Sequence, residues 1–392
     1  MEPPRPSALE QKPELISQAD SIIRGLQELR KFEFSWSDSD PVLTATSLHQ
    51  LRLEKDGLCW LESSLLPQLQ RQCASLSGAL RDPSHLREDA ASTLKFILEI
   101  QTNLAQILYK TIGVLDGIFP GKIPEPHETN DQHFGELKIY RLYSFNKSFR
   151  EDVKNHLNKL FHEFIFILEE FKLSRETSLN FIKYLLFDSD QAFDRTIGFL
   201  KGSELSFIWD LWEKVIPQYD LEFEGLSIQM GPMRYYEAEI NPLSRPVIDL
   251  GTPFMAIFKL SRSFFKKLCR ERINKEELEL FTEMCSDQLF SFNRSTRGVY
   301  ESLSNLKFAI GHADEYDRIN TSSTLLQELH NLKSYFQNFL YLITLYILPV
   351  LFPKSTDFPS QIYFQNWFVT WNTSFLTVTH EAIRLAKAFQ ES

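Results

Sequence analysis

The chain is poor in glycine: its 392 residues include only 14 glycines, against 33 phenylalanines. Glycine supplies the backbone conformations of tight turns, so its scarcity argues against many short strands joined by hairpins. Aromatic side chains are well suited to packing between long helices. We therefore predict an all-α protein, a multi-helix bundle of long amphipathic helices, with enough residues for one large or two ordinary domains.

Cysteines are also few, and no Cys-x-x-Cys pair occurs. A widely spaced set in a chain of this length predicts free thiols in a reducing compartment, most of them buried as small apolar residues. The first residues, MEPPRPSALEQKPEL, contain no apolar core of a secretory signal. We therefore expect a cytoplasmic protein, with the nucleus as a second location. The thiols are Cys59, Cys73, Cys269 and Cys285.

The common catalytic motifs are missing from the sequence. It has no GxxxxGK[ST] phosphate loop, no GxGxxG dinucleotide loop and no GxSxG nucleophile elbow. His162-Glu163 and His380-Glu381 begin like the zinc motif HExxH, but Phe166 and Arg384 stand where the second histidine is needed. We assign no catalytic, cofactor-binding or metal-binding residue and expect no cofactor. Enzymatic activity is left open but is the less favoured interpretation.

One polar loop, residues 121–133, gathers potential metal ligands: His127, Glu128, Asp131 and His133. Imidazole and carboxylate groups together bind divalent transition metals when a loop folds around the ion. The alternative is a solvated loop, or local capping by Asn130 and Asp131. We favour the second interpretation because such residues are common in loops between helices.

The formal net charge is −10, which disfavours broad binding to nucleic acid or to an anionic membrane surface. Cations nevertheless cluster in one region, and the cluster suggests contact with an acidic or phosphate-bearing partner. The alternative is a solvated helix face with its cations near the C-terminus of the helix. The cluster comprises Arg262, Lys266, Lys267, Arg270, Arg272 and Lys275.

The clearest helical pattern lies in residues 325–350, where apolar side chains recur at alternating gaps of four and three. Residues 364–389 show the same pattern, and a Pro-containing turn separates the two. This arrangement predicts a C-terminal antiparallel helical hairpin. Within it, we expect Phe336 and Phe339 to lie near Phe375. The apolar run 339–352 is shorter than the roughly 20 residues of a membrane span, so we interpret it as a buried core helix.

Four segments make up the expected domain organisation. Residues 1–12 are Pro-rich and predicted to be disordered, and residues 13–216 form an N-terminal helical bundle. Residues 217–251 contain several prolines and glycines without helical periodicity, which predicts an irregular crossover. Residues 252–392 form a C-terminal helical bundle. The two bundles are either separate domains or two halves of one.

Several helix boundaries follow from local signals. Pro13 is suited to the start of the first helix, and Thr252 with Pro253 to the start of another. Pro67 falls inside an apolar pattern, which predicts a kink or a later helix start. Residues 176–187 and 190–201 are expected to form two short helices, and Ser203 to cap the next one.

The pattern QIYFQNWFVTWNTSF near the C-terminus, with NDQHFGELKIYRL and LESSLLPQLQRQCASLSGAL earlier, resembles a group of uncharacterised intracellular helical proteins expanded in rust fungi. More distantly, the helix TPFMAIFKLSRSFFKKL and the helices after it resemble the cyclin-D-binding Maid/GCIP-like family. The resemblance implies an all-helical fold and a regulatory, protein-binding role without catalysis.

From these observations we expect a non-enzymatic helical protein-binding or scaffold protein with a protein partner, no nucleic acid and no membrane span. The alternative is an enzyme or ligand carrier whose pocket lies between helices and combines residues distant in the sequence.

Overall fold

The computed structural model describes residues 8–32, 55–79, 89–119, 121–173, 180–231, 243–270, 278–352 and 358–391. The protein is all-α, as predicted: α-helices cover well over half of the chain, and the described residues contain no β-strand. The chain divides into two compact units. Unit 1 comprises Met1–His127 and Phe134–Gly202, and unit 2 comprises Glu128–His133 and Ser203–Ser392.

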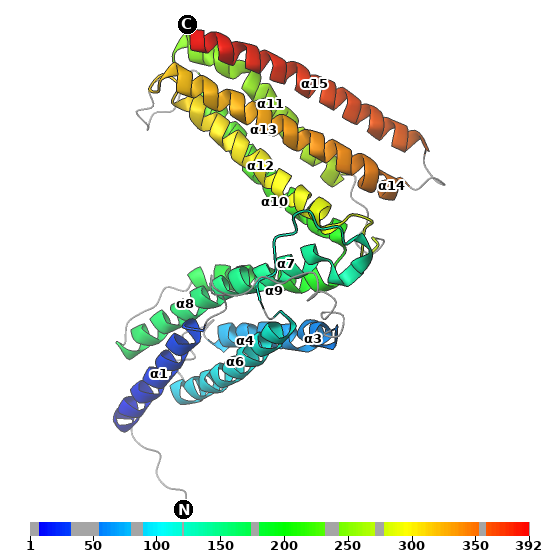
Figure 1. The fold of residues 1–392 in the computed structure, drawn as a ribbon. Coiled ribbons are helices and arrows are strands. Elements are labelled where there is room, and N and C mark those ends of the chain that lie inside the picture. The colour runs from blue at the N-terminus through cyan, green and yellow to red at the C-terminus, as the bar shows by residue number, and fades with distance from the viewer. Residues whose placement is uncertain are drawn as a thin grey trace, which may run out of the picture. The chain divides into compact units, whose positions relative to one another are not determined.

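Unit 1 is built from helices of unequal length (Figure 1). In chain order its elements are α1 (Ala8–Arg30), α3 (Lys55–Trp60), the π-helix η2 (Leu61–Leu65), α4 (Leu66–Ala79), α6 (Ala90–Ile118), the 3-10 helix η3 (Gln132–Leu137), α7 (Ile139–Lys147), the π-helix η4 (Ser148–Val153), α8 (Lys154–Lys172) and α9 (Asn180–Lys201). The first two residues of η3 belong to unit 2.

Helix α6 shows how the sequence specifies this unit. Asp89 caps its N-terminus, with the side chain accepting a hydrogen bond of 3.3 Å from the Ser92 N–H. The apolar face of α6, which includes Leu94, Leu104 and Leu108, is buried together with the polar residue Gln101. Helices α1 and α4 pack against α6, so this face forms part of the core.

Pro67 is the second residue of α4, the helix that directly follows the π-helical turn η2. Proline has no N–H to donate to the preceding turn, and the π-helical turn changes the regular α-helical hydrogen-bonding pattern at that point. The predicted irregularity is therefore a local widening of the helix, and Leu61, Leu65 and Leu69 remain buried on both sides of it.

Unit 2 consists mainly of long helices that lie side by side (Figure 1). They are α10 (Glu204–Met230), α11 (Arg245–Arg270), α12 (Ser286–Gly311), α13 (Arg318–Leu342) with its continuation through the π-helix η6 (Ile343–Ile347) and α14 (Leu348–Leu351), and α15 (Phe358–Glu391).

Aromatic rings hold these helices together. Phe264 of α11 lies 5.2 Å from Phe336 of α13 and 4.7 Å from Trp371 of α15, measured between ring centroids. Trp212 of α10 lies 5.8 Å from Phe292 of α12. One aromatic core thus connects the long helices of the unit, as the high phenylalanine content indicates.

The predicted C-terminal hairpin is confirmed. The Phe336 ring lies 4.9 Å from both Trp371 and Phe375, which joins α13 to α15. Helix α11 packs against α15 as well, and the Trp371 indole N–H donates a 2.9 Å hydrogen bond to the Leu260 carbonyl. Helix α11 therefore packs against the hairpin as a third helix, which the apolar spacing within the two hairpin helices does not predict.

Two predicted helix starts are wrong. Helix α1 begins at Ala8, so Pro13 lies inside it, and the predicted disorder of residues 1–12 is wrong for 8–12; residues 1–7 lie outside the described residues. Helix α11 begins at Arg245, with Pro253 inside it, and the Thr252 hydroxyl bonds to the Ile248 carbonyl at 3.0 Å instead of capping. Buried apolar residues before Pro253, such as Val247 and Leu250, extend the helix across the proline.

The predicted irregular crossover at 217–251 is wrong over most of its length. Residues 217–230 belong to α10 and 245–251 to α11, while 232–242 lie outside the described residues. Pro217 is accommodated within α10, whose buried residues Val215 and Tyr219 flank it. The main division of the chain into two compact units instead falls between Gly202 and Ser203.

Ser203 is the N-cap residue of α10, as predicted, but its hydroxyl donates to the Glu279 carbonyl at 2.7 Å instead of bonding to its own helix. The two short helices expected over 176–187 and 190–201 are a single helix, α9, from Asn180. Residues 174–179, where the first was expected to begin, are not described.

In the described part of the chain, one helix, Arg318–Leu351, is long and apolar enough to cross a membrane by length and composition. The core helix of a soluble protein passes the same test. Its predicted apolar face, including Leu325, Leu332 and Phe339, is buried in unit 2, whereas Tyr341 and Leu345 are exposed.

Candidate docking surface

One candidate site is a groove in unit 2 between α11 and α15, with a volume of about 260 Å³. Residues at helical spacing on α11 form one wall, and Trp367 of α15 contributes the other. We call this the basic groove, and its lining residues are Lys259, Arg262, Ser263, Lys266, Lys267, Arg270 and Trp367.

Charge in the basic groove is strongly one-sided. The described residues of its lining include five cations and no carboxylate. Asp220 of α10 lies beside it, contacting Arg262 and lying 3.6 Å from the Lys266 ammonium group. One carboxylate therefore offsets part of the charge of two cations, and the groove keeps a positive surplus in a chain whose net charge is −10.

Aromatic rings position two of the lysines. The Lys267 ammonium lies 4.8 Å from the Tyr363 ring centroid and 5.1 Å from that of Phe364. The Lys259 ammonium lies 5.5 Å from the Phe223 ring. Such cation–π contacts orient an ammonium group without neutralising its charge.

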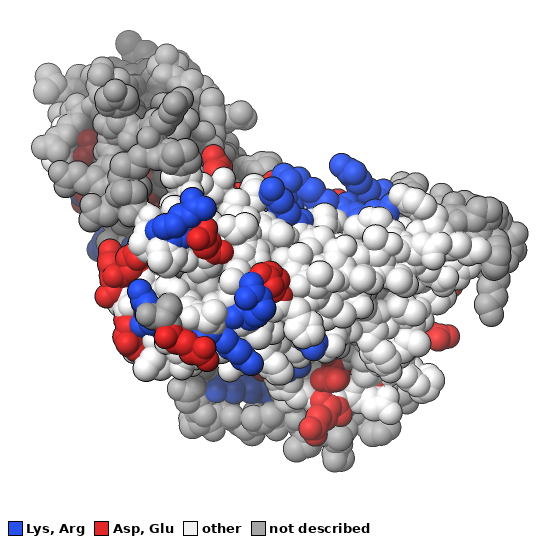
Figure 2. Space-filling model, turned by 90° about the horizontal axis from the view of Figure 1, so that it is seen from above, with Lys and Arg blue, Asp and Glu red and all other residues white. Residues whose placement is uncertain are grey.

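The outer face of α15 next to the groove carries no formal charge. Between Phe358 and His380 the sequence contains no Lys, Arg, Asp or Glu. Ile362, Tyr363 and Val369 are exposed on this helix. Figure 2 shows a broad uncharged area on this side of the molecule, with Lys and Arg side chains gathered along one edge of it.

Hydroxyl groups on α15 are satisfied within the helix. Those of Thr370, Thr373, Ser374 and Thr377 each donate to the carbonyl four residues earlier, at 2.9 Å. A hydroxyl that already donates to a carbonyl of its own helix loses less hydrogen-bonding free energy when it is removed from water. This helix face can therefore be covered by a partner at a low desolvation cost.

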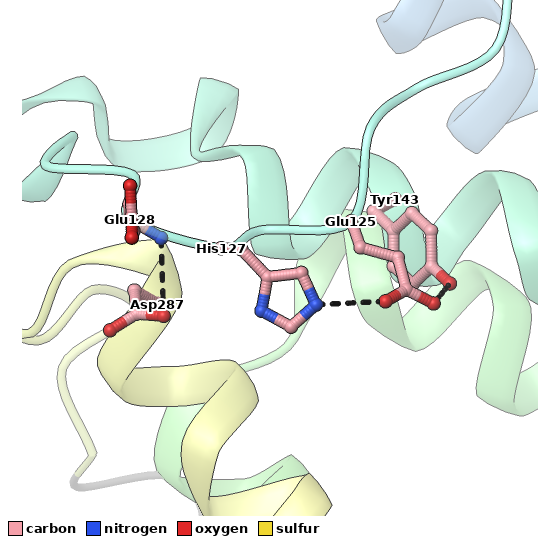
Figure 3. A network of polar contacts seen from close by, with 5 residues as sticks. All are labelled: Glu125, His127, Glu128, Tyr143 and Asp287. Atoms are coloured by element: carbon pink, nitrogen blue, oxygen red, sulfur yellow. Dashed lines mark hydrogen bonds and ion pairs between the residues drawn. The ribbon is translucent and has the colours of Figure 1, made fainter.

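The loop considered for metal binding does not gather its four residues around one point. His127 Nε2 lies 2.9 Å from a Glu125 carboxylate oxygen, and the Tyr143 hydroxyl donates to the other oxygen of Glu125 at 3.1 Å. Figure 3 shows the His127 ring directed toward Glu125, whereas Glu128 contacts Asp287 through its backbone N–H. Partial burial, followed by the charge of Glu125, raises the pKa of Tyr143 to about 12.

Asp131 has a capping role, as the alternative interpretation of the loop proposes, but at a helix distant in the sequence. It is 5% exposed, and its two carboxylate oxygens accept from the Ser286 backbone N–H at 2.7 Å and the Ser286 hydroxyl at 2.6 Å. Ser286 is the first residue of α12. His133 lies 3.1 Å from the Gln132 side chain. Among the residues that the structure describes, no group of three or more His, Cys, Asp or Glu side chains could hold a metal ion.

Sequence analysis identified four cations of the basic groove: Arg262, Lys266, Lys267 and Arg270. Arg272 and Lys275 of the same cluster lie outside the described residues. It did not identify Trp367 or Asp220, because only the packing of α10, α11 and α15 brings them together. Trp209, Trp212 and Trp371 are buried in the core.

A second hollow, of about 300 Å³, lies in unit 1 between α1 and α6. Among the described residues that line it, Lys95 is the only titratable one, and the others are Gln18, Ile22, Ala91, Ser92, Leu94 and Leu98. It offers no pair of groups for acid–base chemistry. The four cysteines are free thiols, as predicted, but the expectation that most of them are buried is wrong: Cys73 is buried, Cys269 and Cys285 are half-buried and Cys59 is exposed.

Comparison with known proteins finds two family matches. Residues 203–384 match a family described as Domain of unknown function (DUF8721), and residues 54–196 match one described as Domain of unknown function (DUF8723). Neither the curated proteins nor the solved structures gave a match. The matched segments fall in different compact units, apart from residues 128–133. The chain thus joins two helical segments that are each similar to a domain family of unknown function.

Proposed function

We propose that this protein is a non-enzymatic helical binding protein whose unit 2 docks an acidic segment of another protein along the basic groove and the neighbouring face of α15. The observation that carries the proposal is the charge contrast: five cations line one groove of a chain with a net charge of −10.

Charge favours this kind of partner for two reasons. A local positive patch attracts acidic segments and accelerates their association, while the net negative charge of the whole chain opposes extended polyanions such as nucleic acid. Lys266 and Arg262 already share Asp220, so an acidic side chain from a partner would enter a site arranged for carboxylate contact.

The face of α15 supplies the apolar part of the proposed interface. Ile362 and Val369 are exposed there without any charged neighbour on the same stretch of helix. Affinity in protein complexes comes mainly from such desolvated apolar and aromatic contacts, with charged rims steering the encounter. An amphipathic acidic segment has both properties.

Affinity capture of binding proteins with the full chain tests the proposal. The test variant replaces Lys267 and Arg270 by Glu, and the control variant replaces Arg384 and Lys387, at the other end of the same unit, by Glu. We expect wild type and control to retain a protein that contains an acidic segment, and the groove variant to lose it. Equal retention by both variants would contradict the proposal.

The finer family assignments remain proposals as well. Relationship to the helical proteins expanded in rust fungi, or to the cyclin-D-binding Maid/GCIP-like family, agrees with an all-helical, protein-binding role. A cytoplasmic location, with the nucleus second, is likewise proposed on the basis of the free cysteines.

A further inference from the structure

We propose that the outer face of the C-terminal hairpin, formed by α13, η6 and α15, is an interface that binds a second copy of this chain. The inference goes beyond the proposed function, because the described lining of the basic groove includes no residue of α13 or η6. Both surfaces include the outer face of α15, so an acidic segment docked there and a second copy would compete for it.

Both helices of the hairpin contain long segments without formal charge. The sequence has no Lys, Arg, Asp or Glu at 334–352 or at 358–380. Exposed large side chains in these segments include Tyr341, Leu345, Ile362, Tyr363 and Val369. None of these five has a charged residue within four positions in the sequence, which is about one helical turn.

Other exposed apolar side chains have charged surroundings. Each of the other large apolar residues exposed in the described part of the chain, from Trp60 to Val350, has a Lys, Arg, Asp or Glu within four positions. On α10, for example, Leu221 follows Asp220 directly, and Ile228 lies four residues after Glu224. Among the described residues, the hairpin is therefore where exposed apolar side chains lack charged neighbours along their own helix.

A second copy fits this face because an uncharged face is complementary to itself. Two chains that each carry a net charge of −10 repel one another, so a contact between them is favoured where neither brings a charge into the interface. A two-fold symmetric interface uses the same patch on both partners. Gln337, Gln365 and Asn366 are exposed on these helices, and an amide group both donates and accepts hydrogen bonds, so identical amides can pair across a two-fold axis.

The size of the face suits a dimer. Helices α13 and α15 pack against each other, so their outer faces adjoin. At about 1.5 Å of rise per residue the two uncharged segments are each roughly 30 Å long, and two neighbouring helices are together about 20 Å wide. The face therefore spans roughly 600 Å², which approaches the ~800 Å² that each partner buries in an interface of standard size.

Covering this face costs few hydrogen bonds to water. The Thr344 hydroxyl donates to the Leu340 carbonyl at 2.6 Å, as the hydroxyls of α15 do within their own helix. The exposed amides favour a protein surface over a lipid bilayer, because hydrocarbon offers them no hydrogen-bond partner, whereas a second copy does.

Sedimentation velocity of the full chain over a series of concentrations tests the inference. We expect a reversible equilibrium between monomer and dimer. The variant Tyr341→Lys/Leu345→Lys should raise the dissociation constant of the dimer at least about tenfold, because it places two cations opposite their own copies in an apolar interface.

The control variant is Leu221→Lys/Ile228→Lys on α10. The side chains that it replaces are 68% and 55% exposed, against 60% and 47% for Tyr341 and Leu345, and both variants change the net charge of the chain equally. We expect the control to keep the wild-type dissociation constant.

Salt dependence separates this interface from one held by ion pairs. Because salt screens the repulsion between the two copies, raising the ionic strength from about 0.1 M to about 0.5 M should tighten the dimer or leave it unchanged. A dimer that salt weakens about tenfold would be held by charge and would overturn the inference.

Three further results would overturn the inference. The first is a wild-type chain that stays monomeric at every concentration, and the second is a dimer that survives in Tyr341→Lys/Leu345→Lys or is lost equally in the control. The third is a monomeric chain that cosediments with phosphatidylcholine vesicles and loses this binding in Tyr341→Lys/Leu345→Lys, which would assign the face to a membrane. None of these results decides the role of the basic groove, which Lys267→Glu/Arg270→Glu tests separately.

Discussion

The Phe336→Ala substitution tests the aromatic core of unit 2. Phe336 is 1% exposed, and its ring lies within 5.2 Å of the rings of Phe264, Trp371 and Phe375, measured between centroids. Because these neighbours belong to α11 and α15, the substitution removes contacts that join three helices. Truncating a buried phenylalanine to alanine costs about 3–5 kcal/mol in unfolding free energy, through lost burial and the cavity that remains.

The control is Lys333→Ala on the same helix, since Lys333 is exposed and should cost roughly 0.5 kcal/mol or less. Denaturant unfolding followed by tryptophan fluorescence suits the comparison, because Trp209, Trp212, Trp367 and Trp371 all belong to unit 2. The Phe336→Ala midpoint should fall well below that of Lys333→Ala. Equal midpoints would refute the assignment of α13, α11 and α15 to one core.

Two further predictions concern polar groups. Asp131→Ala should destabilise unit 2 by about 2–3 kcal/mol, because it leaves the buried Ser286 N–H and hydroxyl without their charged acceptor. The control, Asp287→Ala, loses only an exposed hydrogen bond of 3.3 Å and should cost much less in the same denaturation assay. Equal costs would contradict the capping role of Asp131. Tyr143, with its pKa raised to about 12, binds its proton more tightly when folded, so its contribution to stability is complete below pH ~10 and is lost as the pH rises toward 12. Ultraviolet titration should show one tyrosine fewer ionising near pH 12 in Tyr143→Phe than in the wild type, and an unchanged titration would contradict this assignment.

Apolar periodicity was sufficient to predict the fold class and the C-terminal hairpin. In α13 and α15 the spacing of apolar residues predicts which helix face is buried. Phe336, Phe339 and Phe375 lie on the predicted faces and are buried.

Prolines account for most of the errors. Pro13, Pro217 and Pro253 each lie inside a helix, whereas local rules place proline at helix starts or in irregular segments. In α10 and α11 the buried residues on both sides of the proline extend the helix through it, and burial of this kind depends on tertiary packing. The boundary between the two units was misplaced for the same reason.

Only the α11 side of the basic groove can be predicted from the sequence. Spacing along α11 reveals that Lys266, Lys267 and Arg270 share a face, since they belong to one helix. The part played by Trp367 and Asp220 depends on how α10 and α15 pack against α11, and no local pattern carries that information. Asp131 and Ser286, which are distant in the sequence, show the same limit.

The most direct measurement of the central claim is site-specific photo-cross-linking from the groove itself. A photoreactive phenylalanine replaces Trp367 in the full chain, and a control places it at Tyr109, an exposed aromatic residue of unit 1. We predict that position 367 cross-links to an acidic segment of a partner protein, that position 109 does not, and that Lys267→Glu/Arg270→Glu abolishes the cross-link. A cross-link at 367 that persists in this variant, or equal cross-linking from both positions, would contradict docking through the basic groove.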